Sequence, residues 1–286
     1  MQTTPRANLQ RILIGSVNPV ARGVLRNQDG ELAAGTAVTA SVYTLAGVLS
    51  GTAGRATAAG VGAGAYTVAL TSAEAATLNV WRVDWLDGGV KRCETFHRIV
   101  GGFMFSRAEL EARPGIGGSF TTAVIDQARE WITNLIERQT GAAWSPRYDV
   151  DVFTAKGWPV HACEFRPVRA VRTITLDNGA TTVDVTNIEI NTDVGTIGGS
   201  TFYGLCKVGY EHGYDQPPES LRLPALVAAA DVLTRGTSGV SERTRSVSND
   251  MGVVQQFSFP GLNHPTGIDF VDSAIMDHDQ RLPSFG

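Results

Sequence analysis

Apolar and polar residues alternate with the period of β-strands over the first hundred residues. The alternation is clear at Val38–Tyr43, Tyr66–Leu70 and Val80–Trp85. Short alternating runs that are separated by glycine-rich turns are typical of a β-sandwich. The pattern therefore predicts a small immunoglobulin-like sandwich over residues 1–102. Within it, we expect a loosely ordered arm at the N-terminus, up to about the fifteenth residue, and a long flexible loop at Gly51–Gly64.

Helical periodicity replaces strand periodicity after the glycine pair of Val100–Gly102, which is therefore the predicted domain boundary. Ser106 and Glu109 have the spacing of a capping box, and this predicts a short helix. A longer amphipathic helix is expected over residues 121–139, where apolar side chains recur every three or four positions before Gly141.

The rest of the chain combines a second strand-rich segment with two more helices. Apolar and polar residues alternate again over residues 145–210, so we expect a β insertion there. The segment 220–235 is apolar around most of its circumference, and such helices are usually buried in a core or against a partner. Pro224 must lie in its first turn or kink it. A flexible loop is expected at 238–250, which is rich in Ser and charge, and a last helix at 267–280.

Length and composition agree with a two-domain protein. A chain of 286 residues can bury two cores. The expected fold class is an all-β immunoglobulin-like sandwich over 1–102, followed by an α+β domain over 103–286 that has a helical core and a β insertion. The formal net charge of −4 at pH 7 argues against a protein that grips nucleic acid through its phosphates.

The sequence also gives no reason to expect a membrane span, a disulfide framework or a structural metal site. No apolar run approaches the length of a membrane span, and the polar N-terminus does not resemble a signal peptide. The three cysteines, Cys93, Cys163 and Cys206, are odd in number and widely spaced. They predict buried free thiols rather than a disulfide framework or a zinc pattern.

No residue pattern points to catalysis, a cofactor or a bound metal. Three consecutive residues near the C-terminus, Asp277, His278 and Asp279, would point in different directions on a helix. The simplest interpretation is a solvated acidic helix end and not a metal site. His212 is placed in a turn with no nucleophile motif nearby, which favours a structural hydrogen bond. The other acidic or imidazole side chains that crowd the C-terminus are His264, Asp269 and Asp272. The tryptophans Trp81, Trp85 and Trp131 have the strand or helix spacing that is typical of a core.

A family resemblance is carried by the segments Trp144–Arg147, Arg166–Asp177, Val208–Tyr214 with Pro217 and Pro218, Glu242–Arg243, Arg245–Ser246, Pro265–Ile268 and Val271–Asp272. In order and spacing, these segments resemble head-to-tail adaptor (connector) proteins of long-tailed phages of actinobacteria. The similarity is best between about Val100 and Asp272, and the β-rich first domain is similar to members that carry an immunoglobulin-like extension. Pro224 departs from the expected pattern of the central helix.

The resemblance implies a structural role without an enzymatic activity or a cofactor. Such adaptors form a ring, usually a dodecamer, beneath the portal protein of the filled head, and they offer a platform to the next neck protein, a stopper or tail-completion protein. Double-stranded DNA passes through the lumen without specific binding, and the ring lies at the head–tail junction of the virion after assembly in the host cytoplasm. We expect the surfaces toward the portal or a neighbouring copy to include Arg243, Arg245, Asp250, Phe257, Phe259, Ile268 and Val271.

One alternative remains open at the level of sequence. The first hundred residues could recognise a glycan or a host surface, because sandwich folds carry many functions. In that case the protein would be a surface binder that carries a sandwich domain, and residues 20–100 alone would bind the glycan.

Overall fold

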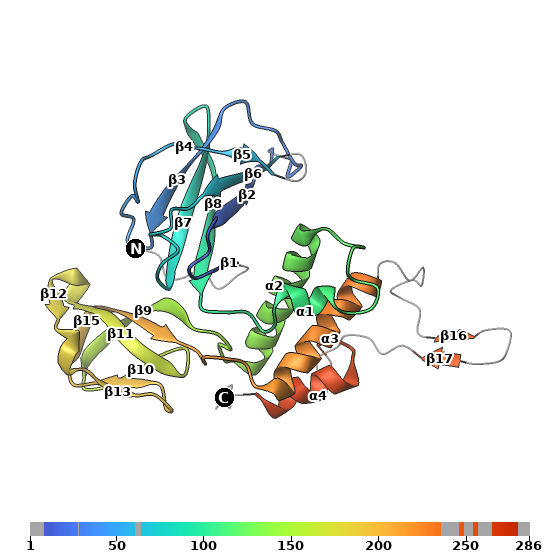
Figure 1. Ribbon diagram of the computed structural model, residues 1–286. Coiled ribbons are helices and arrows are strands. Elements are labelled where there is room, and N and C mark those ends of the chain that lie inside the picture. Colours follow the sequence, from blue (N-terminus) through green and yellow to red (C-terminus); the bar gives the residue numbers. More distant parts are fainter. Residues whose placement is uncertain are drawn as a thin grey trace. The chain divides into compact units, whose positions relative to one another are not determined.

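The computed structural model describes residues 9–27, 29–60, 64–235, 246–248, 254–256 and 265–279. The chain divides into two compact units, of which one joins Met1–Gly102 to Pro146–Gly213 and the other joins Phe103–Ser145 to Tyr214–Gly286. The first unit is strand-rich with several sheets, and the second contains the helices (Figure 1). The first unit is interrupted after Gly102, the position at which the sequence predicts a domain boundary. The β insertion, however, groups with the N-terminal sheets and not with the helices.

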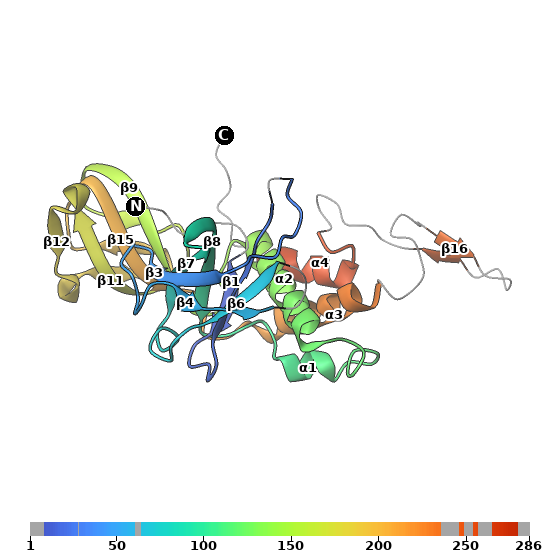
Figure 2. The same ribbon diagram turned by 90° about the horizontal axis from the view of Figure 1, so that it is seen from above.

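The N-terminal residues form two sheets that share one apolar core. One sheet has five strands in the order β1-β8-β7-β3-β4, and the other has three in the order β2-β6-β5 (Figures 1 and 2). Trp85 and Val42 of the larger sheet and Ala21 and Val68 of the smaller one belong to a single buried cluster. This arrangement is compatible with the predicted β-sandwich. The strands are β1 (Gln10–Leu13), β2 (Val20–Val24), β3 (Val38–Thr44), β4 (Arg55–Ala56), β5 (Ala58–Ala59), β6 (Ala65–Ala69), β7 (Asn79–Asp87) and β8 (Val90–Val100).

Two segments for which we predicted little order contain strands instead. Gln10–Leu13 pairs in parallel with β8, so the prediction of a loose arm is wrong there. Within Gly51–Gly64, β4 begins at Arg55, whose guanidinium lies 2.6 Å from the carboxylate of the buried Glu74. Burial alone would raise the pKa of Glu74, but its hydrogen bonds with Arg55 and Ser50 lower that pKa to about 2. This ion pair ties the segment to the rest of the first unit.

Residues 147–212 form two further sheets, as the predicted β insertion. Their orders are β12-β11-β15-β9 and β10-β14-β13, with antiparallel neighbours throughout. The long strands β9 and β15 pair from Arg147 opposite His212 onward. Val208 and Ile197, one from each sheet, belong to one buried cluster. The elements are β9 (Arg147–Trp158), β10 (His161–Ala162), β11 (Val168–Leu176), η1 (Asp177–Gly179), β12 (Thr181–Val183), η2 (Val185–Asn187), β13 (Glu189–Asn191), β14 (Thr196–Gly198) and β15 (Phe202–His212).

The described helices of the second unit begin and end largely where the sequence predicts. Ser106 and Glu109 form a reciprocal capping box at the start of α1. Thr121 caps α2, and Gly141 ends it with a φ of 67°, a left-handed conformation that glycine adopts without strain. The helices are α1 (Arg107–Glu111), α2 (Thr122–Thr140), α3 (Glu219–Arg235) and α4 (Asp269–Asp277).

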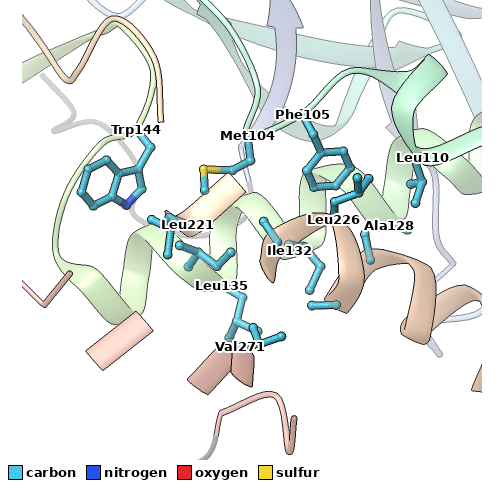
Figure 3. Packing of buried hydrophobic residues seen from close by; sticks show 14 of the residues in the cluster. Met104, Phe105, Leu110, Ala128, Ile132, Leu135, Trp144, Leu221, Leu226 and Val271 are labelled. Carbon is cyan, nitrogen blue, oxygen red and sulfur yellow. The ribbon is translucent and has the colours of Figure 1, made fainter. Parts of the chain in front are cut away.

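These helices pack around one apolar core (Figure 3). Ile132 of α2, Leu226 of α3 and Val271 of α4 belong to the same buried cluster. Pro224 lies inside α3, beyond its first turn, where a proline removes one backbone hydrogen bond. None of the described helices is long and apolar enough to cross a membrane.

A short antiparallel pair follows α3. It consists of β16 (Ser246–Ser248) and β17 (Val254–Gln256). The prediction of a flexible loop at 238–250 is therefore wrong for residues 246–248. The remainder of that loop lies outside the described residues.

Candidate functional site

The predicted interface residues fall into two groups. Arg243, Arg245, Asp250, Phe257 and Phe259 lie outside the residues that the structure describes. The remaining two, Ile268 and Val271, are at the start of α4.

Val271 does not lie on a free surface. Its side chain is fully buried in the helical core (Figure 3). Ile275, one turn later, belongs to the same buried cluster. Ile268 is half-buried at the N-cap position of α4 and packs against the same core. Residues three, four and seven positions apart share one face of a helix, and in α4 this face points inward. The interface prediction is therefore wrong for Val271, and the exposed apolar side chains of α4 are Phe270 and Met276.

An exposed stripe on α2 is a better candidate for a contact surface. We define the α2 stripe as the exposed residues Val124, Gln127, Trp131 and Arg138. Val124 and Trp131 are seven residues apart, so they lie on the same side of the helix two turns apart. The indole of Trp131 is 49% exposed, although its spacing predicted a core residue. That prediction is wrong for Trp131 and confirmed for Trp81 and Trp85, which are both buried.

The reason lies in how α2 packs. Ile125, Ile132 and Ile136 face the helical core and are fully buried or nearly so. Val124 and Trp131 each precede one of these isoleucines by one residue, and one residue corresponds to a rotation of about 100° around the helix. The apolar face of α2 is therefore wider than the core it covers. Aromatic and Arg side chains are enriched where proteins bind one another, and large exposed apolar groups mark such surfaces.

A buried ionic group joins β8, β9 and β15 in the first unit. Asp149 accepts a hydrogen bond of 2.7 Å from Arg98 on one oxygen and of 2.7 Å from His212 on the other. The carboxylate is 1% exposed and the imidazole is completely buried. His212 is the last residue of β15 and not part of a turn. The predicted structural hydrogen bond of His212 is confirmed.

The surroundings of this group set its protonation states. Burial alone would raise the pKa of Asp149, but the Arg98 guanidinium and the His212 hydrogen bond hold it well below its usual range. Burial lowers the pKa of His212 to about 4, and its Nδ1 atom has no hydrogen-bond partner among the described residues. Asp149 therefore stays ionised and His212 stays neutral near pH 7, with the Nε2 hydrogen donated to the carboxylate. The arrangement stabilises strand pairing and offers no proton to a substrate.

Acidification is expected to destabilise the first unit through His212 and the buried His97. Burial lowers the pKa of His97 to about 3. The unfolded chain takes up a proton on each histidine near pH 6.5, whereas the folded chain takes it up only near pH 3–4, so stability is lost as the pH falls between these values. Between about pH 6.5 and 4.5, each histidine is expected to lower the free energy of unfolding by on the order of 3 kcal/mol. We expect the free energy of unfolding in urea to fall less steeply with pH between pH 7 and 4.5 in His97→Gln and His212→Gln than in the wild type. The control His278→Gln, in the helical unit, should keep the wild-type dependence on pH.

One of the acidic residues near the C-terminus, Asp272, is not solvated as expected. Asp272 is completely buried, and its carboxylate accepts hydrogen bonds from the backbone N–H and hydroxyl of Thr266 and from the N–H of Gly267. This closes the turn before α4. His264 lies outside the described residues. Among the described residues, one set of possible metal ligands does come together elsewhere, at Asp151, His161 and Cys163 in the β insertion.

Two comparisons with known proteins, against family models and against curated sequences, gave no match. No protein-family model matches the sequence, and no curated protein is significantly similar to it. A functional assignment for this chain therefore depends on its residues and their geometry.

Proposed function

We propose that this protein is a structural component of a phage neck, a head–tail adaptor whose copies form a ring below the portal. The observation that carries the proposal is the α2 stripe, with its half-exposed Trp131. A closed ring uses heterologous contacts, in which one surface of each copy meets a different surface of the next. An amphipathic helix with surplus apolar area on its outer side suits such a contact.

The sequence segments that resemble head-to-tail adaptors support the same assignment. They occur in both units, in the helices and in the β insertion. In this proposal the N-terminal sheets are an immunoglobulin-like extension, and the partners are the portal protein, neighbouring copies of the chain and the next neck protein. A net charge of −4 suits a channel through which DNA slides, because no dense array of cations would hold its phosphates.

The buried titratable groups fit a role without catalysis. Asp149, His212 and Asp272 are each held by hydrogen bonds within the chain. A catalytic acid or base has to reach a substrate proton, and none of these three carboxylate and imidazole groups is exposed.

The proposal is tested by placing a charge on the α2 stripe. We expect Val124→Glu, alone or with Trp131→Glu, to prevent incorporation into heads that carry a portal, because burying an unpaired carboxylate in an interface is strongly unfavourable. Incorporation is measured by complementation of a phage that lacks the gene, with particles analysed by cryo-microscopy and blotting. Circular dichroism of the purified variants checks that they fold.

The matched control is Val90→Glu, at an exposed valine of the N-terminal sheets. It introduces the same charge and should leave incorporation unchanged. Normal incorporation of the double α2 variant would refute a ring contact at this helix. Absence of the wild-type protein from particle necks, together with glycan binding by residues 20–100, would instead support the surface-binder alternative.

A further inference from the structure

Three side chains that commonly bind transition metals meet inside the β insertion. They are Asp151 of β9, His161 of β10 and Cys163 directly after β10, and their ligand atoms lie within 4.8 Å of one another. All three are at least nine-tenths buried. The sequence signal was the His161-x-Cys163 spacing, in which alternate residues of an extended segment point to the same side.

The backbone and neighbouring side chains hold these groups in place. The N–H of Cys163 donates to the carbonyl of Gly195 at 2.8 Å, and the N–H of Glu164 donates to Asp151 Oδ2 at 3.0 Å. Tyr210 donates its hydroxyl hydrogen to Asp151 Oδ1 at 3.1 Å. The ring of Phe153 stacks on the imidazole of His161 with centroids 3.7 Å apart. Asp151 and His161 are therefore oriented by groups that would remain in place if an ion were bound.

We propose that Asp151, His161 and Cys163 bind a zinc ion. Carboxylate, imidazole and thiolate are its usual ligand types. His161 Nε2 and Asp151 Oδ2 are 3.1 Å apart, close to the separation of about 3.3 Å that tetrahedral coordination with bonds of about 2.0 Å requires. The Cys163 sulfur lies within 4.8 Å of both of these atoms, whereas Zn–S bonds of about 2.3 Å would place it about 3.5 Å from them. The three ligands can therefore converge on one ion after a local adjustment of the sulfur.

The identity of the ion follows from the thiol. Magnesium and calcium take oxygen ligands, whereas a Cys–His–Asp set selects zinc or a chemically similar transition ion. Three protein ligands leave a fourth position for water. Asp151 Oδ2 keeps its hydrogen bond from the N–H of Glu164. The ion takes the place of the hydrogen between His161 Nε2 and the carboxylate, and the neutral imidazole then carries its hydrogen on Nδ1. Tyr210 then orients the carboxylate from the other oxygen, as a supporting partner of a metal ligand.

Burial raises the pKa of the Cys163 thiol, so the sulfur is protonated without the ion. Metal binding displaces this proton, and affinity should increase with pH. The bound ion would tie β9, which ends at Trp158, to β10, which begins at His161, and so link the two sheets of the insertion. The role of the ion is to stiffen the β insertion. This role does not depend on the ring proposed above.

Cobalt(II) provides the test, because it occupies zinc sites and reports thiolate ligation by a charge-transfer band in the near ultraviolet. Full-length protein is stripped with a chelator and titrated. We expect one equivalent of cobalt to produce the thiolate band together with the visible bands of tetrahedral cobalt, and zinc to displace it. Cys163→Ser and His161→Gln should each weaken binding by more than about 100-fold, since even changes to supporting residues cost 10–100-fold. Tyr210→Phe should cost about tenfold.

The matched controls are Cys206→Ser and Cys93→Ser, which remove thiols outside the group and should leave the band intact. If Cys163→Ser fails to fold, protection of Cys163 from alkylation by zinc in the wild-type protein answers the same question. A wild-type cobalt spectrum without a thiolate band, a band that survives in folded Cys163→Ser, or alkylation of Cys163 that zinc does not slow, would each overturn the proposal.

Discussion

Replacement of Asp149 by Asn is expected to destabilise the first unit by about 3–5 kcal/mol, the usual cost of removing one partner from a buried ion pair. Asn keeps the shape of the side chain but not its charge. Arg98, which is 9% exposed, then loses the carboxylate of Asp149 that it contacts, and the nearby Arg147 loses the same counter-charge. Urea unfolding followed by circular dichroism measures the loss at pH 7.

The control for this variant is Asp193→Asn, in the exposed connection between β13 and β14. It makes the same chemical change at the surface, and we expect it to alter the free energy of unfolding by no more than about 0.5 kcal/mol. A loss below about 1 kcal/mol in Asp149→Asn would mean that the ion pair contributes little beyond its own desolvation cost.

Elements that depend on local chemistry were predictable from the sequence. The capping box at Ser106 and the glycine that ends α2 at Gly141 act on neighbouring backbone groups, so their spacing alone identifies them. The strands of the β insertion also follow from alternation. For the two caps, the interaction that decides the structure lies within a few residues of the chain, whereas alternation identifies the strands but not their partners.

What could not be predicted depends on contacts between distant segments. Asp149 and Asp151 alternate with Tyr148, Val150 and Val152, and the ordinary rule would bury the apolar set. The structure buries the two aspartates and leaves the other three half-buried. The reason is that Asp149 meets Arg98 and His212, which are 51 and 63 residues away in the chain. Alternation shows which residues share a face, but it does not show which face meets a partner.

The candidate site shows the same limit. The helical spacing of Ile268, Val271 and Ile275 correctly placed them on one side of α4, but that side faces the core. Trp131 has the spacing of a core residue, yet it lies just outside the strip that the other helices cover. The group of possible metal ligands was missed because Asp151 comes from β9, whereas His161 and Cys163 lie in and directly after β10.

Replacement of Trp85 by Ala is expected to destabilise the N-terminal sheets by about 3–5 kcal/mol, the usual cost of removing a buried aromatic side chain. Trp85 is completely buried in the core that the two sheets share, and its indole N–H donates to Thr95 Oγ1 at 2.8 Å. Trp158→Ala is the matched control because its indole is largely outside the cores of the first unit, 47% exposed. We expect the control to lose about 1 kcal/mol or less. Equal losses in the two variants would contradict the assignment of Trp85 to the core.

The reason that Trp85 fits is the absence of a side chain at Gly23 of β2. A Cβ atom at Gly23 would lie only 2.2 Å from Cε2 of the Trp85 ring, so Gly23→Ala should cost about 1–3 kcal/mol by overpacking. In the Trp85→Ala background the ring is gone, and the same substitution should cost far less. A double-mutant cycle of unfolding free energies therefore gives a coupling of about 1–2 kcal/mol if the two residues touch across the sheets. Additive losses would show that the packing of β2 against β7 does not depend on this contact, and that another feature of the two sheets holds them in register.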